Sequence, residues 1–181
     1  MDANLYSIGN YIVEVFNNPS KSIGSKLQEN LLQECLSLIQ NSFGNNNLGI
    51  DDVKAHIIDS STSIFIRDQT RNIVGLATTS LKKIKHINII YLQGTAISQE
   101  YKGKGLYNFL TSIRIEEGIK KIRSSHNRNN TILIGSRTQS PLVYRSMNRK
   151  LGLFPNPDGY IDRYIKEIAP GFVRSLDKRC N

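Results

Sequence analysis

The stretch QEYKGKGLYNFL, residues 99–110, contains the residue types that a phosphate-binding loop needs. It follows an apolar run typical of a strand and leads into a segment with helical spacing. The first turn of a helix has unpaired backbone N–H groups and partial positive charge, so it attracts anions. Gly103 and Gly105 let the backbone approach a ligand closely, and Lys102 and Lys104 add positive charge. The residues therefore predict a phosphate site, with an ordinary surface turn as the alternative.

Two common phosphate-binding motifs are excluded by the spacing. The dinucleotide fingerprint needs a third glycine at position 108, which is Asn108, and an acidic residue at a strand end further on. The nucleoside-triphosphate loop needs four residues between its glycines and a following Lys-Ser or Lys-Thr pair, whereas Gly103 and Gly105 are one residue apart. A single short loop of this kind implies one pyrophosphate-sized anion without a magnesium ion.

The elements around this loop predict one α/β domain over residues 1–181. β-Branched and aromatic runs indicate strands over 10–16, 62–68, 73–84, 86–98 and 131–136. Helical spacing of apolar residues indicates helices over 26–43, 50–61, 106–122, 140–152 and 161–168. Pro170 and Gly171 are expected to end the last of these helices, which leaves 171–176 as a candidate for a final strand.

The strand at 86–98, the loop after it and the order of elements resemble the GCN5-related N-acetyltransferase (GNAT) superfamily. Its acyl-CoA motif is Gln/Arg-x-x-Gly-x-Gly/Ala, which falls here on Glu100 to Gly105, with Glu100 where Gln or Arg is usual. The resemblance covers roughly residues 8–154 and is strongest over 62–154. It implies a mixed, mostly antiparallel central sheet, splayed between the family's fourth and fifth strands and flanked by helices. The segment 155–181 departs from the family because it has helical spacing.

The resemblance implies acetyl-CoA as a co-substrate and a backbone site for it. The loop would cradle the pyrophosphate through Tyr101, Lys102, Gly103, Lys104, Gly105, Leu106 and Tyr107. The end of the preceding strand would pair with the pantetheine arm through the backbone of Ala96, Ile97 and Ser98. Gly94 fits a β-bulge that begins the splay, although a glycine there could also be a weak point in a strand.

The residues for catalysis are less well defined. Acyl transfer to an amine needs a proton acceptor for the amine and a proton donor for the leaving thiolate. Strand 86–98 has no carboxylate, so its polar residues Tyr91 and Gln93 are the candidates for orienting water at the amine. In the family, the thiolate is protonated by a tyrosine on the helix after the fifth strand, four residues before the Gly-Phe pair that ends this helix. Asn148 stands at that distance from Gly152, and Tyr144, one turn earlier, is the candidate acid, with a packing role as the alternative.

Three functions follow from these observations. The first is an N-acyltransferase that moves an acetyl group from acetyl-CoA to a primary amine by direct transfer in a ternary complex. The second is a non-catalytic acyl-CoA-binding or regulatory domain, which the missing carboxylate and tyrosine favour. The third is nucleic-acid binding. Two observations argue against it: the cations are scattered along the sequence, and no aromatic–basic motif is present. No metal is expected, because His56, His86 and His126 lie too far apart for paired ligands.

Charge and composition limit the partners. The chain has 24 Lys and Arg residues and 15 Asp and Glu residues, which gives a net charge of +9. This charge favours an anionic partner; the alternative is that the basic residues only form a solvated surface. The same balance argues against aminoglycosides and polyamines as acceptors, leaving other small-molecule amines or a protein amine. Two cysteines without a ligand or redox motif, a start without a basic leader and the lack of a long apolar stretch predict a cytoplasmic protein without a membrane span. A homodimer is compatible with the sequence.

Overall fold

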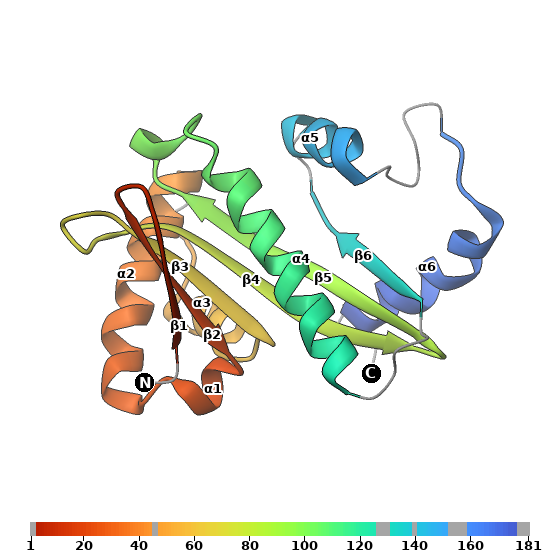
Figure 1. Cartoon of the computed structure of the whole chain (residues 1–181), viewed down its shortest axis with the longest axis horizontal. Helices are drawn as coiled ribbons and strands as arrows, with labels where there is room; N and C mark the ends of the chain where they lie inside the picture. The colour runs from red at the N-terminus through yellow and green to blue at the C-terminus, as the bar shows by residue number, and fades with distance from the viewer. Residues whose placement is uncertain (1–2, 45–46, 126–130, 139–140, 152–158, 177–181) are drawn as a thin grey trace.

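A six-stranded sheet forms the centre of the computed structural model, which describes residues 3–44, 47–125, 131–138, 141–151 and 159–176 (Figure 1). In spatial order the strands are β1 (Ala3–Ile8), β2 (Tyr11–Asn17), β3 (Thr62–Arg67), β4 (Ile73–Ile84), β5 (Ile87–Ile97) and β6 (Ile132–Ser136). Neighbouring strands run antiparallel from β1 to β5, and β6 pairs with β5 in parallel. This is the mixed, mostly antiparallel sheet that the sequence predicts.

Helices cover both faces of the sheet. They are α1 (Pro19–Ser22), α2 (Ser25–Phe43), α3 (Ile50–Ile57), α4 (Leu106–Ser124), α5 (Pro141–Leu151) and α6 (Arg163–Leu176), and a 3₁₀ turn, η1 (Gln99–Tyr101), precedes α4. One face packs against α4 and α5, and the opposite face packs against α2 and α3 at one end and α6 at the other. No helix of the described ranges is long and apolar enough to cross a membrane.

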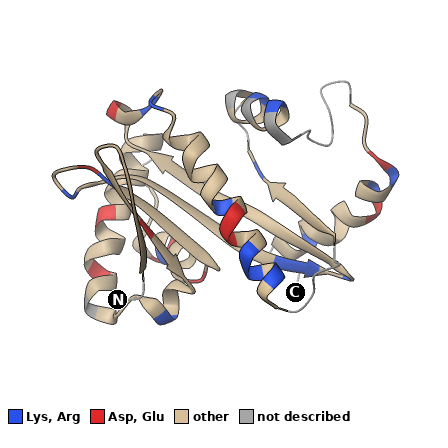
Figure 2. Ribbon diagram, viewed as in Figure 1, with Lys and Arg blue, Asp and Glu red and all other residues tan. Residues whose placement is uncertain are grey.

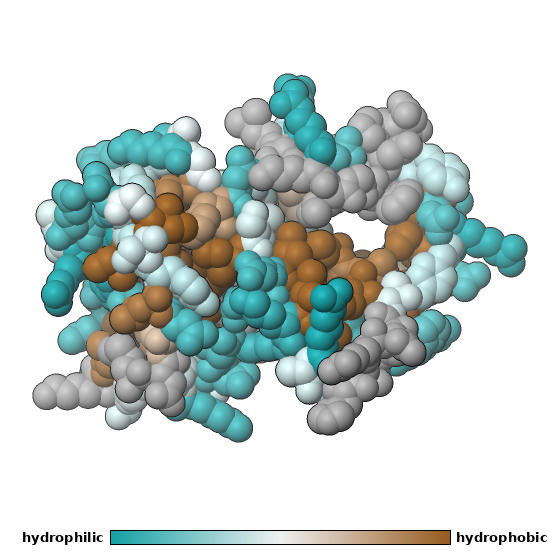
Figure 3. All heavy atoms as spheres, in the orientation of Figure 1, coloured by the Kyte–Doolittle hydropathy of each residue, from teal (hydrophilic) through white to brown (hydrophobic). Residues whose placement is uncertain are grey.

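Alternating side chains of the strands build a separate core on each face. Val13, Ile64 and Ile66 pack with Leu110 of α4, while Phe65 packs on the other face with α2 and α3. This period of two is what a sheet buried on both sides requires. Towards β6 the cover is thinner: its apolar residues are only partly buried, and apolar surface is visible between α4 and α5 in Figure 3.

Cys35 of α2 lies in the core. Its side chain is fully buried among the α2, α3 and sheet residues and forms no disulfide. Burial is the main cause that raises the pKa of its thiol to about 12, because a thiolate would lose its hydration there. The thiol is therefore neutral and acts as a small apolar side chain.

Besides the one-turn helix α1, which the sequence did not predict, two larger parts of the fold differ from the sequence-based expectation. The first is β1, which pairs in register with β2 through the turn at Gly9 and is an edge strand with largely exposed side chains. A strand without a buried face lacks the apolar alternation on which the prediction depends. Because of this additional strand, the strands expected to be the family's fourth and fifth are β5 and β6 in this structure.

The second difference is the C-terminal segment, where α6 continues through Pro170 to Leu176. The expectation that Pro170 and Gly171 end the helix is wrong, and 171–176 is helical instead of a strand. Proline removes one helical hydrogen bond, which costs about 3 kcal/mol in an isolated helix. Packing offsets that cost, because Ile168 and Phe172 lie one turn apart on the face that covers Ile89 of β5.

The contact between α6 and β6 is very close at Gly135. A Cβ built there would lie 2.5 Å from Cζ of Phe172 and 3.3 Å from Cγ2 of Ile89. We expect Gly135→Ala to lower the free energy of unfolding by about 1–3 kcal/mol, as overpacking does in other cores. Urea denaturation measures this loss.

The Phe172→Ala background provides the control for this prediction. With the ring removed, the added methyl group has space, so Gly135→Ala should cost much less there. An equal cost of Gly135→Ala in both backgrounds would show that the ring contact does not explain the effect.

Candidate functional site

The loop between β5 and α4 has the open backbone that a phosphate site needs. Gly103 and Gly105 have φ of +80° and +79°, and a Cβ built on either would meet no atom within 4 Å. The first hydrogen bond of α4 runs from the N–H of Phe109 to the carbonyl of Gly105, 3.2 Å away. Within the described ranges, no acceptor is recorded for the backbone N–H groups of 103–107. These amides and the glycine space suit an anion of diphosphate size.

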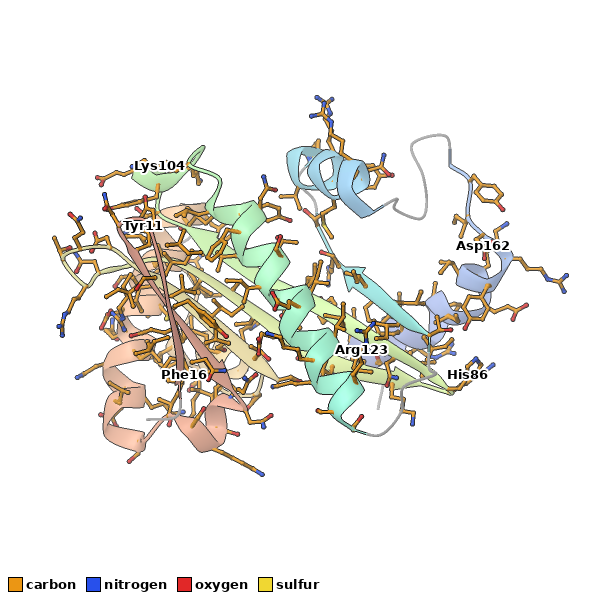
Figure 4. The ribbon with its side chains drawn as sticks, in the orientation of Figure 1. Tyr11, Phe16, His86, Lys104, Arg123 and Asp162 are labelled. Atoms are coloured by element: carbon orange, nitrogen blue, oxygen red, sulfur yellow. The ribbon has the colours of Figure 1, made fainter. Side chains whose placement is uncertain are left out.

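Side chains of the loop are tied to the rest of the fold. The hydroxyl of Tyr101 donates to Oδ2 of Asp68 in the β3–β4 turn, 2.9 Å away, and this bond is the main cause that raises the pKa of Tyr101. The ring of Tyr101 meets that of Tyr11 edge to face, with centroids 6.2 Å apart. Lys104 Nζ lies 4.4 Å from the centre of the Tyr101 ring, and Figure 4 shows Tyr11 and Lys104 at the same end of the molecule. Tyr101 therefore fixes the loop.

Asp68 is itself held by the turn that it closes. Its carboxylate accepts hydrogen bonds from the hydroxyl and the N–H of Thr70 and from the N–H of Asn72. The Thr70 hydroxyl is the largest of the causes that lower the pKa of Asp68. The carboxylate is thus a fixed anchor for Tyr101 near neutral pH.

Lys102 and the end of β5 are both joined to α2. The Lys102 ammonium donates to the carbonyl of Ser42 near the C-terminus of α2, 3.3 Å away, where the helix dipole favours a cation. The Ser42 hydroxyl donates to the carbonyl of Ile97 at 2.9 Å. The start of the loop is therefore fixed at the edge of the sheet.

A β-bulge lies in β5 at the position predicted for Gly94. Ala77 pairs with Thr95, but Thr79 pairs with Leu92, so β5 has one extra residue across from Thr78. The N–H of Gly94 donates to the Thr78 hydroxyl, 3.3 Å away. The parallel pairing with β6 stops at Leu92, and within the described ranges no strand pairs with the rest of β5 on that side, where the Ile97 carbonyl accepts from the Ser42 hydroxyl. The bulge and the parting of the two strands thus coincide.

The open edge of β5 presents the backbone of alternate residues. The N–H of Ser98 donates to the carbonyl of Val74 on β4, 2.9 Å away. Because hydrogen-bonding groups alternate along an antiparallel strand, Ala96 and Ser98 face β4, while Thr95 and Ile97 face the open edge. Of the three residues predicted to pair with a pantetheine arm, Ile97 faces the open edge, where its carbonyl already accepts from the Ser42 hydroxyl. Thr95 also faces this edge and is an addition that only the register shows.

Arg114 of α4 reaches the bulge from the α4 face of the sheet. Its side chain is 2% exposed, and its Nη1 donates to the carbonyl of Gly94 at 3.3 Å and to that of Thr78 at 3.5 Å. Nη2 donates to the hydroxyl of Thr111, and Nε has no partner among the described residues. Desolvation lowers the pKa of Arg114 to about 10, which leaves it positively charged near neutral pH. A buried cation therefore holds the carbonyl of the bulge.

A pocket of about 270 Å³ lies on the opposite face of the sheet at the same bulge. Its floor is formed by residues of β4 and β5, namely Leu76, Thr78, Gly94, Thr95 and Ala96. Its walls come from α2, α3 and the segment between them, namely Ile39, Phe43, Leu48, Asp52, Val53, His56 and Ile57. The residues that would hold a pantetheine arm thus also border a pocket large enough for a small molecule.

Asp52 and His56 are polar residues one turn apart on α3 that the sequence prediction did not assign to the site. Nδ1 of His56 lies 2.9 Å from the carbonyl oxygen of Asp52. A carbonyl oxygen can only accept, so Nδ1 carries the hydrogen and neutral His56 has a lone pair on Nε2. Oδ2 of Asp52 accepts from the N–H of Gly49 at 3.1 Å. Their spacing of four in IDDVKAHI is the sequence signal for a shared helix face.

The structure separates the two predicted catalytic tyrosines. Tyr91 lies on the α6 face, where its ring meets that of Phe172 edge to face with centroids 5.5 Å apart. Burial raises the pKa of Tyr91, so its phenol stays protonated near neutral pH. Tyr144 lies half-buried on α5, whose Val143 and Met147 pack on the α4 face. The roles of both tyrosines remain predictions. Gly152, the helix end from which the position of the catalytic tyrosine was counted, lies outside the described residues.

One group of basic residues lies away from the loop. Figure 2 shows Lys and Arg together at the C-terminal end of α4 and at the β4–β5 turn. His86 lies in that turn, and Figure 4 shows it at the end of the sheet far from Lys104. The described residues contain no group of three or more His, Cys, Asp or Glu that could hold a metal ion, and His126 lies outside them.

Known proteins share this architecture at low sequence identity. An aminoglycoside acetyltransferase from an uncultured soil metagenomic sample, solved with sisomicin, is 11% identical, with a TM-score of 0.56 over 86% of this chain and 95% of that one. The aminoglycoside N-acetyltransferase AAC(6')-Iy, solved with CoA, is 14% identical, with a TM-score of 0.51 over 90% of this chain and 97% of that one.

A third structure extends the comparison to an enzyme named for a protein acceptor. The ribosomal-protein-alanine N-acetyltransferase of Brucella melitensis biovar Abortus 2308 is 10% identical, with a TM-score of 0.51 over 84% of this chain and 99% of that one. No protein-family model and no curated protein sequence matches the chain. The chain therefore has the fold of the GCN5-related N-acetyltransferases.

Proposed function

We propose that this protein transfers an acetyl group from acetyl-CoA to a primary amine. The observation that carries the proposal is the combination, along one stretch of chain, of a bulge at Gly94, an unpaired strand edge and an open turn with free amides. Amides 103–107 would bind the pyrophosphate, and Thr95 and Ile97 would pair with the amide groups of the pantetheine arm. The similar structure solved with CoA supports this choice of co-substrate.

Acetyl-CoA would supply an activated acyl group, and the chain would supply position and charge. Holding two reactants in the correct geometry is itself a large part of such catalysis. Arg114 fixes the Gly94 carbonyl, and its buried charge favours negative charge near the bulge. Tyr144 is proposed as the proton donor to the departing sulfur. Tyr91, which faces α6, is proposed to orient water, although its side chain lies on the sheet face opposite α5.

The alternative is a domain that binds acyl-CoA without catalysis. The absence of a carboxylate on β5, seen in the sequence, favours it. Both functions predict coenzyme A binding, but only an enzyme releases free thiol from acetyl-CoA when an amine is added. A screen of thiol release over a panel of amines, including small molecules and peptide N-termini, separates the two.

The Tyr144→Phe variant tests the proposed acid within the same screen. Removing the hydroxyl should lower turnover by about 10²-fold, in the range of general acid–base effects, while leaving coenzyme A affinity unchanged. Unchanged turnover would remove Tyr144 from the mechanism and leave it a packing role on α5.

A further inference from the structure

The walls of the pocket beside the bulge are mostly apolar. Ile39 and Phe43 of α2 lie across from Val53 and Ile57 of α3, and Leu76 of β4 lies at the floor. Phe43 is 66% exposed, so the apolar wall of the pocket extends to the surface of the molecule. These walls favour an occupant with an apolar surface, because burial of such surface is the source of the binding free energy.

The polar groups of the pocket are few and suit a single amine. Among the described residues that line it, Asp52 is the only carboxylate, and His56 presents an unprotonated Nε2 when its ring is neutral. At about 30 Å³ for each water molecule, the volume of the pocket equals roughly nine waters, which suits a compact body. A molecule with many hydroxyl and ammonium groups would leave most of them unpaired against the apolar walls.

We infer that the pocket binds small primary amines with a compact apolar body and that His56 takes up the proton of the amine. This inference rests on the proposed acetyl transfer. The floor of the pocket includes Thr95, whose backbone faces the strand edge proposed for the pantetheine arm. An amine in the pocket would therefore lie next to the bulge, where the strands part.

The transfer step balances with these groups. The ammonium gives one proton to Nε2 of His56, and the nitrogen lone pair then forms a bond to the acetyl carbon. The carbon–sulfur bond breaks, and the sulfur keeps its electron pair and takes up the second amine proton by way of a general acid. The products are the N-substituted acetamide and the free thiol of coenzyme A, and the proton on His56 returns to solvent.

The direct test is thiol release from acetyl-CoA with paired amines. We expect kcat/KM for 2-phenylethylamine and hexylamine to exceed that for kanamycin and spermidine by at least about tenfold, the size of effect that one or two methylene groups can give in an apolar pocket. Preference for the polycationic amines would overturn the inference and leave acetyl transfer standing.

A matched pair of variants tests whether the pocket itself makes the selection. Phe43→Ser removes an exposed wall residue and should raise KM for 2-phenylethylamine at least about fivefold, a loss that removal of apolar contact area explains. Ile50→Ser changes an exposed apolar residue of α3 that does not line the pocket, and should have no effect. Equal KM values for the parent and Phe43→Ser would contradict the inference.

A binding measurement keeps the inference testable if no amine releases thiol. The chain contains no tryptophan, so Phe43→Trp introduces a single fluorescent reporter at the wall. Saturable change of its emission with 2-phenylethylamine, but not with kanamycin, would support the pocket even though the proposed enzyme activity had failed. Absence of any response to 2-phenylethylamine, together with absence of thiol release, would overturn the pocket as well.

The role of His56 has its own readout. His56→Gln keeps a polar side chain but removes the proton acceptor, so turnover with 2-phenylethylamine should fall about 10²-fold. With 2,2,2-trifluoroethylamine, which is already neutral at the pH of the assay, the loss should be much smaller. An equal loss for both amines would show that His56 only supports the structure.

Discussion

Gly103→Asp is expected to abolish coenzyme A binding while the chain keeps its fold. The free protein has space for the new side chain, because no atom lies within 4 Å of a Cβ built on Gly103. That space is where we place the pyrophosphate, so the carboxylate would occupy the cradle and repel the phosphates. We expect the affinity for coenzyme A, measured by isothermal titration calorimetry, to fall more than about 10²-fold, since close like charges cost several kcal/mol.

Gly159→Asp is the matched control for this variant. Gly159 has φ of +79° and the same open surroundings, so both substitutions carry the strain of a left-handed non-glycine residue, about 1 kcal/mol. Asp162, three residues further on, lies at the opposite end of the molecule from Lys104 in Figure 4. Gly159→Asp should therefore leave coenzyme A affinity unchanged. If Gly103→Asp binds coenzyme A as the parent does, the assignment of the loop is wrong.

Arg114→Met is expected to separate activity from stability. Methionine fills similar space without a charge. The substitution therefore removes the buried Nε, which has no partner among the described residues, and it also removes the free-energy cost of burying the charge. The free energy of unfolding should stay within about 1 kcal/mol of the parent or increase. The Gly94 carbonyl would lose its donor from α4, and turnover should fall about 10²-fold, as misplacement by about 1 Å can do.

Arg114→Lys provides the comparison that distinguishes charge from packing. Lysine keeps a positive charge and a donor, but it cannot donate to the Thr111 hydroxyl and the Gly94 carbonyl from two separate nitrogens as arginine does. We expect thiol release between that of the parent and that of Arg114→Met. Parallel loss of stability and turnover in Arg114→Met would show instead that Arg114 is needed for folding alone.

The sequence predicted the parts of the site that are made by backbone. Gly94, Gly103 and Gly105 are informative because bulges and left-handed turns select for glycine, whatever surrounds them. The apolar runs of β4 and β5 are long enough that their limits differ from the expectation by one residue or less. For the same reason the order of strands and helices around the loop could be predicted, and with it the fold.

The parts that could not be predicted depend on contacts between distant segments. Pro170 would end an isolated helix, but the contact of Phe172 with Tyr91 and Gly135 keeps α6 intact. Arg114 is the ninth residue of a segment with the pattern of an ordinary amphipathic helix, and only the fold shows that it is buried at Gly94. A cation on a helix is usually exposed, so its sequence position gives no sign of this.

The pocket beside the bulge shows the same limit of prediction from sequence. Asp52 and His56 have helical spacing, but the floor that they face comes from β4 and β5, far along the chain. The direction of backbone groups on β5 likewise follows from its register with β4, which assigns Thr95 and Ile97 to the open edge.

Titration of the ¹⁵N-labelled protein with coenzyme A, followed amide by amide, tests the central claim most directly. We predict that the largest chemical-shift changes occur at the amides of 103–107 and at Thr95 and Ile97, with small changes at the basic β4–β5 turn. Saturable binding with its largest changes at that turn, or no saturable binding at all, would contradict the assignment of this strand edge and helix start as the acyl-CoA site.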